Sequence, residues 1–185
     1  MVTAMGTNLA PDEIVINQWL ADDLSAKVGD RVDLAYFVVG PMRRMEERTN
    51  AFKVKAVVPI EGLYADRTLM PDFPGMANAN NCRDWDTGFP IKTGAIRDKD
   101  EAYWDRYRGT PKAFVSLARG QELWANRFGD LTALRWNVPA GTRPEFFKAL
   151  LEKHALGTLA PESVGLKFEQ ERAQALAAST QGQDF

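Results

Sequence analysis

The chain has 185 residues, of which 45% are hydrophobic and 26% are charged, and its formal net charge is -2. This length suffices for one domain of ordinary size, or two small lobes, with a buried core. Acidic and basic residues are interspersed, so the chain lacks the basic patch typical of nucleic-acid-binding proteins, and we expect no nucleic-acid partner. The single cysteine, Cys82, excludes an internal disulfide and a cysteine-based metal cluster.

The sequence contains neither a recognisable secretion signal nor a membrane span. Residues 1–8 lack the basic start and apolar middle of a signal peptide, and the apolar run 35–39 is far shorter than the roughly 20 residues that cross a bilayer. If the domain works outside the cytoplasm, we expect a part of the protein beyond this sequence to carry it there. Residues 1–12 are small and polar, and we interpret them as a leading segment or a remnant of expression.

The stretch 13–39 is expected to organise the fold. Its β-branched run 14–16 predicts a short strand, and Asn17 predicts the N-cap of a helix that starts at the next residue. That helix is expected to bury Leu20 and Leu24, which are four residues apart.

The second half of this stretch predicts a turn and a strand. The acidic residues of the helix, Asp22 and Asp23, are expected to face water. Residues 27–30 (KVGD) have turn chemistry, because glycine adopts positive φ at little cost. A period-2 pattern follows, and it places four apolar side chains on one face: Val32, Leu34, Tyr36 and Val38.

The motif formed by a strand, then NQWLADDL, then KVGDRVDLAYFV resembles the extracytoplasmic core domain of MacB-like and FtsX-like ABC transporter permeases. In that family an asparagine-led helix and a Lys-x-Gly-Asp turn feed the strands of a small β-rich subdomain. The resemblance implies an α+β fold with a small mixed or antiparallel sheet and packed helices.

The next segments predict a hairpin and then an irregular region. Residues 42–50 form a charged connection to a strand at 52–58, which we expect to pair antiparallel with the strand before it. Residues 59–110 are rich in proline, glycine and tryptophan, so we expect a long irregular insertion. Within it, acidic residues favour a helix that runs from Asp98 to about Arg108.

The following elements are predicted as a strand at 112–117, a helix at 121–128 closed by Gly129, and a strand at 131–138. The letters DEAYWDRYRGTPKAFVSL and GQELWANRFGDLTALRW resemble a group of large FtsX-like permeases with an expanded extracytoplasmic domain. This similarity is more specific than the first motif, because the segments are long and rich in tryptophan.

The C-terminal part predicts two helices. Thr142 and Glu145 fit a capping box, and the helix that follows is expected to end near Gly157 and to bury Phe146 or Phe147 with Leu150 and Leu151. Residues 166–168 are predicted as extended and 169–178 as helical. The ending AQALAASTQGQDF resembles the segment that leads into the next membrane helix of these permeases.

Catalytic chemistry has little support in the sequence. No glycine-rich phosphate loop is present, so any ATP hydrolysis belongs elsewhere in the system. An acidic group could suggest a hydrolase or a cation site: Asp84, Asp86, Asp98, Asp100, Glu101 and Asp105. Helix capping explains its members at 98–101, and we expect no catalytic residue, metal or cofactor.

Three further features have a functional and a structural interpretation. Aromatic residues could form a candidate surface for a partner or ligand, or could hold the irregular segment to the sheet: Trp85, Tyr103, Trp104, Tyr107 and Trp124. His154 is expected to interact with carbonyls at a helix end. Arg83 could lower the pKa of the neighbouring Cys82 thiol.

Together these features predict a non-catalytic extracytoplasmic core domain at 12–168 and a juxtamembrane segment at 169–185, with a hinge at 170–185. The resemblance implies coupling of membrane-helix movement to an exported substrate or protein. The implied partners are the membrane part of the same permease, a separate ABC ATPase subunit and a periplasmic or outer-membrane protein. The alternatives are a free-standing glycan- or ligand-binding module and a hydrolase that uses the acidic group.

Overall fold

The computed structural model describes residues 1–87, 91, 93–126, 129–166 and 170–181. The chain divides into two compact units, Met1–Leu134 and Arg135–Phe185. The first unit contains a curled mixed sheet with helices packed on it, so the predicted α+β class is confirmed.

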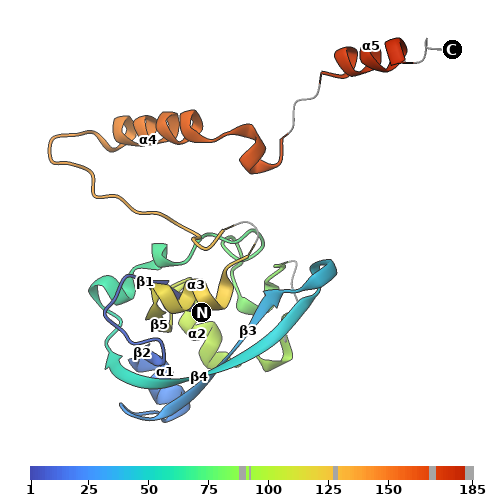
Figure 1. Ribbon diagram of the computed structural model, residues 1–185. Coiled ribbons are helices and arrows are strands. Elements are labelled where there is room, and N and C mark those ends of the chain that lie inside the picture. The colour runs from blue at the N-terminus through green and yellow to red at the C-terminus, as the bar shows by residue number, and fades with distance from the viewer. Residues whose placement is uncertain (88–90, 92, 127–128, 167–169, 182–185) are drawn as a thin grey trace. The chain divides into compact units, whose positions relative to one another are not determined.

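The sheet of the first unit has five strands in the order β1-β5-β2-β4-β3 (Figure 1). The strands are β1 (Val2–Met5), β2 (Glu13–Asn17), β3 (Arg31–Val39), β4 (Met45–Val58) and β5 (Ala113–Ser116). The helices are α1 (Gln18–Leu24), α2 (Asp98–Tyr107) and α3 (Leu117–Trp124). The pairs β1/β5 and β2/β4 are parallel, whereas β2/β5 and β3/β4 are antiparallel.

The predicted unit of strand, capped helix, turn and strand is confirmed. The side-chain oxygen of Asn17 accepts a hydrogen bond from the backbone N–H of Leu20 at 2.9 Å, as an N-cap should. Gly29 forms the turn with φ +95°, and its N–H donates to the carbonyl of Val54 at 2.8 Å. This unit therefore supplies two strands, β2 and β3, to the sheet.

Two details of α1 differ from the prediction. Leu24 is 53% exposed, and Ala21 is the buried residue of the helix. The helix is only seven residues long and ends at Ser25 in the left-handed region, so its last turn does not reach the core. The carboxylate of Asp23 does not face water: its side chain is 7% exposed and pairs with Arg97 at 2.7 Å.

The hairpin of β3 and β4 is longer than predicted. Its register runs without a shift from Arg31 opposite Lys53 to Val39 opposite Met45. The expected charged connection at 42–50 is wrong, because β4 begins at Met45 and a short turn spans residues 40–44. Strand β4 can accommodate charged side chains in its first half because both faces of that half are exposed.

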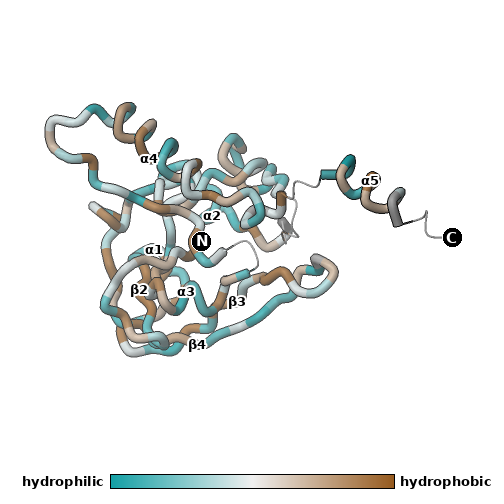
Figure 2. Tube along the Cα trace, turned by 45° about the horizontal axis from the view of Figure 1, so that its top comes forward, coloured by the Kyte–Doolittle hydropathy of each residue, from teal (hydrophilic) through white to brown (hydrophobic). Residues whose placement is uncertain are grey.

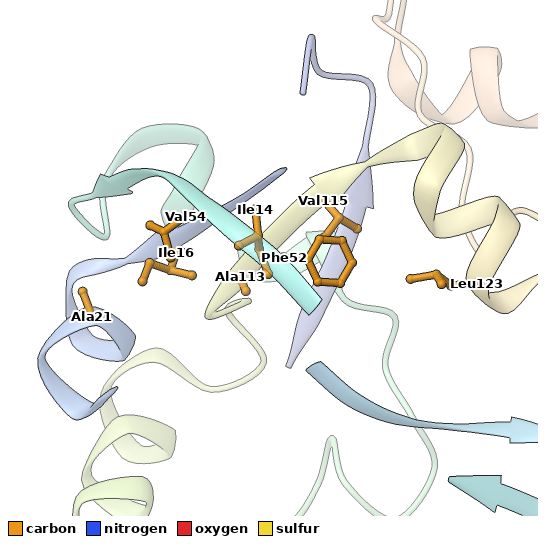
Figure 3. Packing of buried hydrophobic residues seen from close by; sticks show 8 residues of the cluster. All are labelled: Ile14, Ile16, Ala21, Phe52, Val54, Ala113, Val115 and Leu123. Atoms are coloured by element: carbon orange, nitrogen blue, oxygen red, sulfur yellow. The ribbon is translucent and has the colours of Figure 1, made fainter. Parts of the chain in front are cut away.

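The hydrophobic core lies on the central strands and is covered by α1 and α3 (Figure 3). Its buried members are Ile14, Ile16, Ala21, Phe52, Val54, Ala113, Val115 and Leu123. Strand β1 lies in the segment 1–12, where we predicted no strand. It pairs with β5 and passes under α3 at Gly120, where a Cβ would overlap that of Ala4.

The described residues between 59 and 97 contain only short 3-10 turns among their regular elements. These turns are η2 (Gly62–Ala65), η3 (Arg67–Leu69), η4 (Cys82–Asp84) and η5 (Thr93–Ala95). The predicted helix at 98–108 is confirmed as α2. Its cap is Arg97 rather than Asp98, and the Arg97 N–H donates to the Asp100 carboxylate at 3.1 Å.

The predictions after residue 116 are partly wrong. Helix α3 begins four residues before the predicted start, because the Ser116 hydroxyl caps the backbone N–H of Arg119 at 3.3 Å. Residues 127–128 of the predicted helix lie outside the described part. Residues 131–138 form no strand, and their apolar side chains, including Trp136 at 54%, are exposed. Alternation alone does not make a strand without a hydrogen-bonded neighbour.

The second unit contains α4 (Pro144–Thr158), η6 (Pro161–Val164) and α5 (Glu171–Gln181). Helix α4 starts after Arg143, so Thr142 is not its cap. None of its residues is buried, and Phe146 is 63% exposed, so the predicted burial of its apolar residues is wrong. The predicted C-terminal helix is confirmed as α5, whereas 167–168 of the predicted extended segment lie outside the described residues.

Within the part of the chain that the structure describes, no helix combines the length and apolarity needed to cross a membrane.

Candidate functional site

The structure brings together four of the five aromatic residues that the sequence singled out. Tyr103, Trp104 and Tyr107 lie on α2, and the Trp85 ring meets the Trp104 ring edge-on with centroids 5.0 Å apart. Trp124 belongs to a different contact, 5.5 Å from the Tyr36 ring of β3. Tyr103 and Trp104 are only 2% and 3% exposed, so their ring faces are not open to a large partner.

Tyr103 is hydrogen-bonded to the cap of α1. The Asn17 amide donates to the Tyr103 hydroxyl at 3.0 Å and to the Pro111 carbonyl at 3.4 Å, and that hydroxyl donates to the Thr110 carbonyl at 3.1 Å. Asn17 and Thr110 are buried, so these polar groups satisfy one another away from water. Burial raises the pKa of Tyr103 to about 12.

A lysine next to this junction is enclosed by rings and a carboxylate. The Lys112 ammonium lies 3.5 Å from the centroid of Trp19 and 4.5 Å from that of Tyr103, and 3.2 Å from the Asp100 carboxylate. Burial lowers the pKa of Lys112, and Asp100 opposes that shift. Burial alone would raise the pKa of Asp100, but hydrogen bonds from Arg97 and Lys112 outweigh it and lower the pKa to about 2.

A second polar contact joins α1 to the start of α2. The Arg97 guanidinium donates to both carboxylate oxygens of Asp23, at 3.0 and 2.7 Å, and Lys99 also pairs with Asp23. A bidentate contact of this kind has a fixed geometry, and its acid is almost fully enclosed. The irregular segment is thus fixed to α1 at two points through α2.

The acidic group is mostly occupied by caps and ion pairs. Glu101 accepts from the backbone N–H groups of Cys82 and Arg83 at 2.8 and 3.2 Å, and Asp98 pairs with the Arg83 side chain at 2.9 Å. Asp84 accepts from the Asn81 amide at 3.0 Å. Across the described residues, no three His, Cys, Asp or Glu side chains converge as metal ligands would.

The pKa of the Cys82 thiol is raised, whereas the neighbouring Arg83 suggested that it would be lowered. The residue is 4% exposed, and burial together with the Glu101 charge raises the pKa of the thiol to about 11. It is therefore a protonated, packed side chain at neutral pH rather than a reactive thiolate.

A cavity of about 400 Å³ lies between α2 and residues 67–80. Its apolar lining includes Met70, Phe73, Met76 and Trp104, and two arginines, Arg67 and Arg108, add positive charge. Neither arginine has a carboxylate partner among the described residues. A cavity with this lining could take a small amphipathic molecule with a negative group.

The two arginines also have structural contacts. Arg67 donates to the Arg106 carbonyl at 3.0 Å, near the end of α2, and Arg108 donates to the Ala79 carbonyl at 3.1 Å. The Trp104 indole donates to the same Ala79 carbonyl at 3.1 Å. Arg108 has φ +50°, a strained value for a residue with a side chain.

A smaller cavity of about 270 Å³ is also lined by Trp104. Its lining includes Cys82, Trp85, Asp100, Tyr103 and Lys112. The Trp85 indole N–H is buried and has no hydrogen-bond acceptor in the described part of the protein. The polar groups that define both cavities, Lys112, Arg67 and Arg108, were not predicted, because their proximity depends on the fold and no local motif marks them.

Comparisons with protein-family models, with curated proteins and with solved structures find no match for this chain.

Proposed function

We propose that this chain is a non-catalytic extracytoplasmic domain of an ABC transporter permease resembling the MacB and FtsX families. The observation that carries the proposal is the unit from Glu13 to Val58. Its sequence resembles the family motif, and it folds as a strand, an asparagine-capped helix, a glycine turn and a hairpin, which are the local elements that the motif implies. The sequence segments DEAYWDRYRGTPKAFVSL and GQELWANRFGDLTALRW, which contribute to α2, β5 and α3, follow one another as in the expanded group that they resemble.

The contacts of α2 support a coupling role. The irregular segment is attached to α2, and α2 is attached to α1 by Asn17 with Tyr103 and by Asp23 with Arg97. A packed, fully bonded junction transmits a displacement because its interior resists compression. The domain would pass movements of the membrane helices to an exported substrate or to a periplasmic or outer-membrane protein, and ATP hydrolysis would occur in a separate subunit.

The first test is the location of the native protein. We expect the full-length protein to sediment with membranes, and this domain to be cleaved by protease added to spheroplasts but not in intact cells. A native protein recovered entirely in the soluble fraction would overturn the proposal.

The second test concerns the hinge at 170–185, whose residues Glu171–Gln181 form α5. Insertion of three Gly-Ser pairs after Gln170 in the full transporter should leave ATP turnover intact and abolish transport, because the displacement would be absorbed by the linker. Unchanged transport would contradict coupling through this segment.

A free-standing binding module is the second candidate, and the cavity of about 400 Å³ favours it. In that case the native protein would be soluble, and a small anionic ligand would bind saturably. Replacing Arg108 with glutamine should weaken such binding, whereas Arg106→Gln, on the same helix but outside the cavity lining, should not.

A further inference from the structure

Strand β3 forms one edge of the sheet and pairs only with β4 on its inner side. All nine of its residues, Arg31–Val39, are paired with β4 in one continuous register. Figure 1 shows β3 and β4 as a long ribbon that extends to the hairpin turn, and Figure 2 shows apolar residues along it. The outer edge of β3 is therefore a continuous row of backbone groups.

The hydrogen bonds at the two ends of the ribbon show which residues face this edge. Just beyond the strand ends, Val54 N–H donates to the Asp30 carbonyl at 2.8 Å, and Gly40 N–H donates to the Arg44 carbonyl at 2.7 Å. Lys53, which lies opposite Arg31, instead donates away from β3, to the Asp12 carbonyl at 2.7 Å.

Bonded and non-bonded pairs alternate in an antiparallel ladder, so the even-numbered residues of β3 bond to β4. The odd-numbered residues direct their N–H and C=O groups to the open edge. These residues are Arg31, Asp33, Ala35, Phe37 and Val39. None of them is a proline, so the edge presents an unbroken row of donors and acceptors.

The usual protections of an edge strand are missing from β3. It contains no proline and no lysine, its register has no bulge, and its two charged residues stand together at its start. Its second half, with Phe37 and Val39 exposed at 36% and 59%, carries no charge. An edge of this kind favours pairing with another strand.

We propose that two copies of this chain associate by antiparallel pairing of their β3 edges, with Ala35 on the two-fold axis. This self-association goes beyond the proposed transport function. The register with Ala35 opposite Ala35 is the one that pairs all nine residues of both strands. In this register, the residues of one copy that direct their N–H and C=O groups to the open edge lie opposite the corresponding residues of the other copy. Antiparallel hydrogen bonding between the two strands requires this arrangement.

The side chains are compatible with this register. Arg31 of each copy lies opposite Val39 of the other, Asp33 opposite Phe37, and the small Ala35 opposite itself. The shifted registers centred on Arg31 or Asp33 would instead place like charges face to face, which is unfavourable. Because each copy has one β3 edge, the two-fold pairing closes as a dimer and does not continue as a filament.

The test uses charge at Val39, whose partner within its own chain is the uncharged Met45. Light scattering after size exclusion, over a concentration series, should give twice the monomer mass for the wild type at millimolar chain concentration. Val39→Lys places a lysine opposite Arg31 of the other copy twice per dimer, so the dissociation constant should rise roughly 2- to 30-fold. Val39→Glu, which creates two opposite-charge pairs, should keep or tighten the dimer.

A pair of proline variants tests which edge is used. Ala35→Pro removes an outward N–H at the centre of β3, and Thr49→Pro is its matched control, because Thr49 lies opposite Ala35 and directs its N–H to the other side of the ribbon. Ala35→Pro should give a monomer and Thr49→Pro a dimer, with circular dichroism as a check of folding. Should either proline variant fail to fold, the Val39 pair decides alone.

A wild type that remains monomeric at millimolar concentration would overturn the proposal. So would equal effects of Val39→Lys and Val39→Glu, or a dimer that survives Ala35→Pro in a folded protein. Loss of the dimer in Thr49→Pro alone would assign the contact to the β4 edge and would equally refute it.

Discussion

Replacing Asn17 with alanine should strongly destabilise the first unit, because this side chain has two separate roles. Its oxygen caps α1 through the Leu20 N–H, and its amide donates to the Tyr103 hydroxyl and the Pro111 carbonyl. The residue is 0% exposed, so water cannot replace these bonds in the variant without rearrangement.

The expected loss follows from adding the separate contributions. Removal of an N-cap costs about 1 kcal/mol, and each lost hydrogen bond costs about 1 kcal/mol when its partner stays buried. The free energy of unfolding should therefore fall by about 3 kcal/mol, a large fraction of the roughly 5–15 kcal/mol typical of a domain. Gln18→Ala, at the exposed neighbouring position, should change stability by less than about 0.5 kcal/mol.

Urea unfolding followed by tryptophan fluorescence measures both values, and a double-mutant cycle with Tyr103→Phe isolates the shared bond. The two substitutions should be non-additive, with a coupling energy of about 1 kcal/mol. Strict additivity, or a cost below about 1 kcal/mol for Asn17→Ala, would refute the junction between α1 and α2.

Three further predictions test the surroundings of α2 and β1. The buried Cys82 thiol, with its pKa raised to about 11, should react with Ellman's reagent at pH 8 only after unfolding, and rapid labelling of the native protein would contradict its burial. The pKa of Asp100 is lowered to about 2 from an ordinary 3.8, so the unfolded chain takes up its proton first as the pH falls. About 1 kcal/mol of stability, after allowance for screening, should be lost between pH 4 and 2, and this loss should be absent in Asp100→Asn. Gly120→Ala should destabilise by about 1–3 kcal/mol despite alanine's better helix propensity, and Ala4→Gly should restore part of that loss; a more stable single variant would refute the close packing of α3 on β1.

The parts of the fold that were predicted correctly from the sequence depend on residues that are close together along the chain. The Asn17 cap, the Gly29 turn and the alternation of β3 each depend on local backbone geometry. Strand β1 was not predicted because its four residues, VTAM, carry no clear strand pattern by themselves and are held as a strand by pairing with β5. The reverse error occurred at 131–138, where the alternating pattern was present but no strand lies beside it.

The candidate site was predicted less well than the fold. The aromatic residues of α2 were found from their composition, but sequence could not separate them from Trp124, which packs on Tyr36 instead. Lys112 was not predicted to matter, because its position between Trp19 and Asp100 requires segments far apart in the chain to meet. The capping role expected for the acids at 98–101 agrees with the contacts of Asp100.

The attachment of the irregular segment explains how so few regular elements can hold it in place. Near its middle, Glu101 binds the backbone at Cys82 and Arg83, and Trp104 binds it at Ala79.

All of these contacts come from one helix, so the middle of the segment depends on α2. Its first part also contacts the sheet, because the Thr3 hydroxyl of β1 donates to the Leu69 carbonyl at 3.0 Å and the Tyr64 ring lies 5.0 Å from the Phe114 ring of β5. Helix α2 is in turn fixed to α1 by Tyr103 at its centre and by Arg97 at its cap. A ligand that moved the residues beside Trp104 would therefore act first on α2 and then on the strand–helix unit, whereas the β3 edge, which α2 does not cover in the sheet order, would remain available for a second copy.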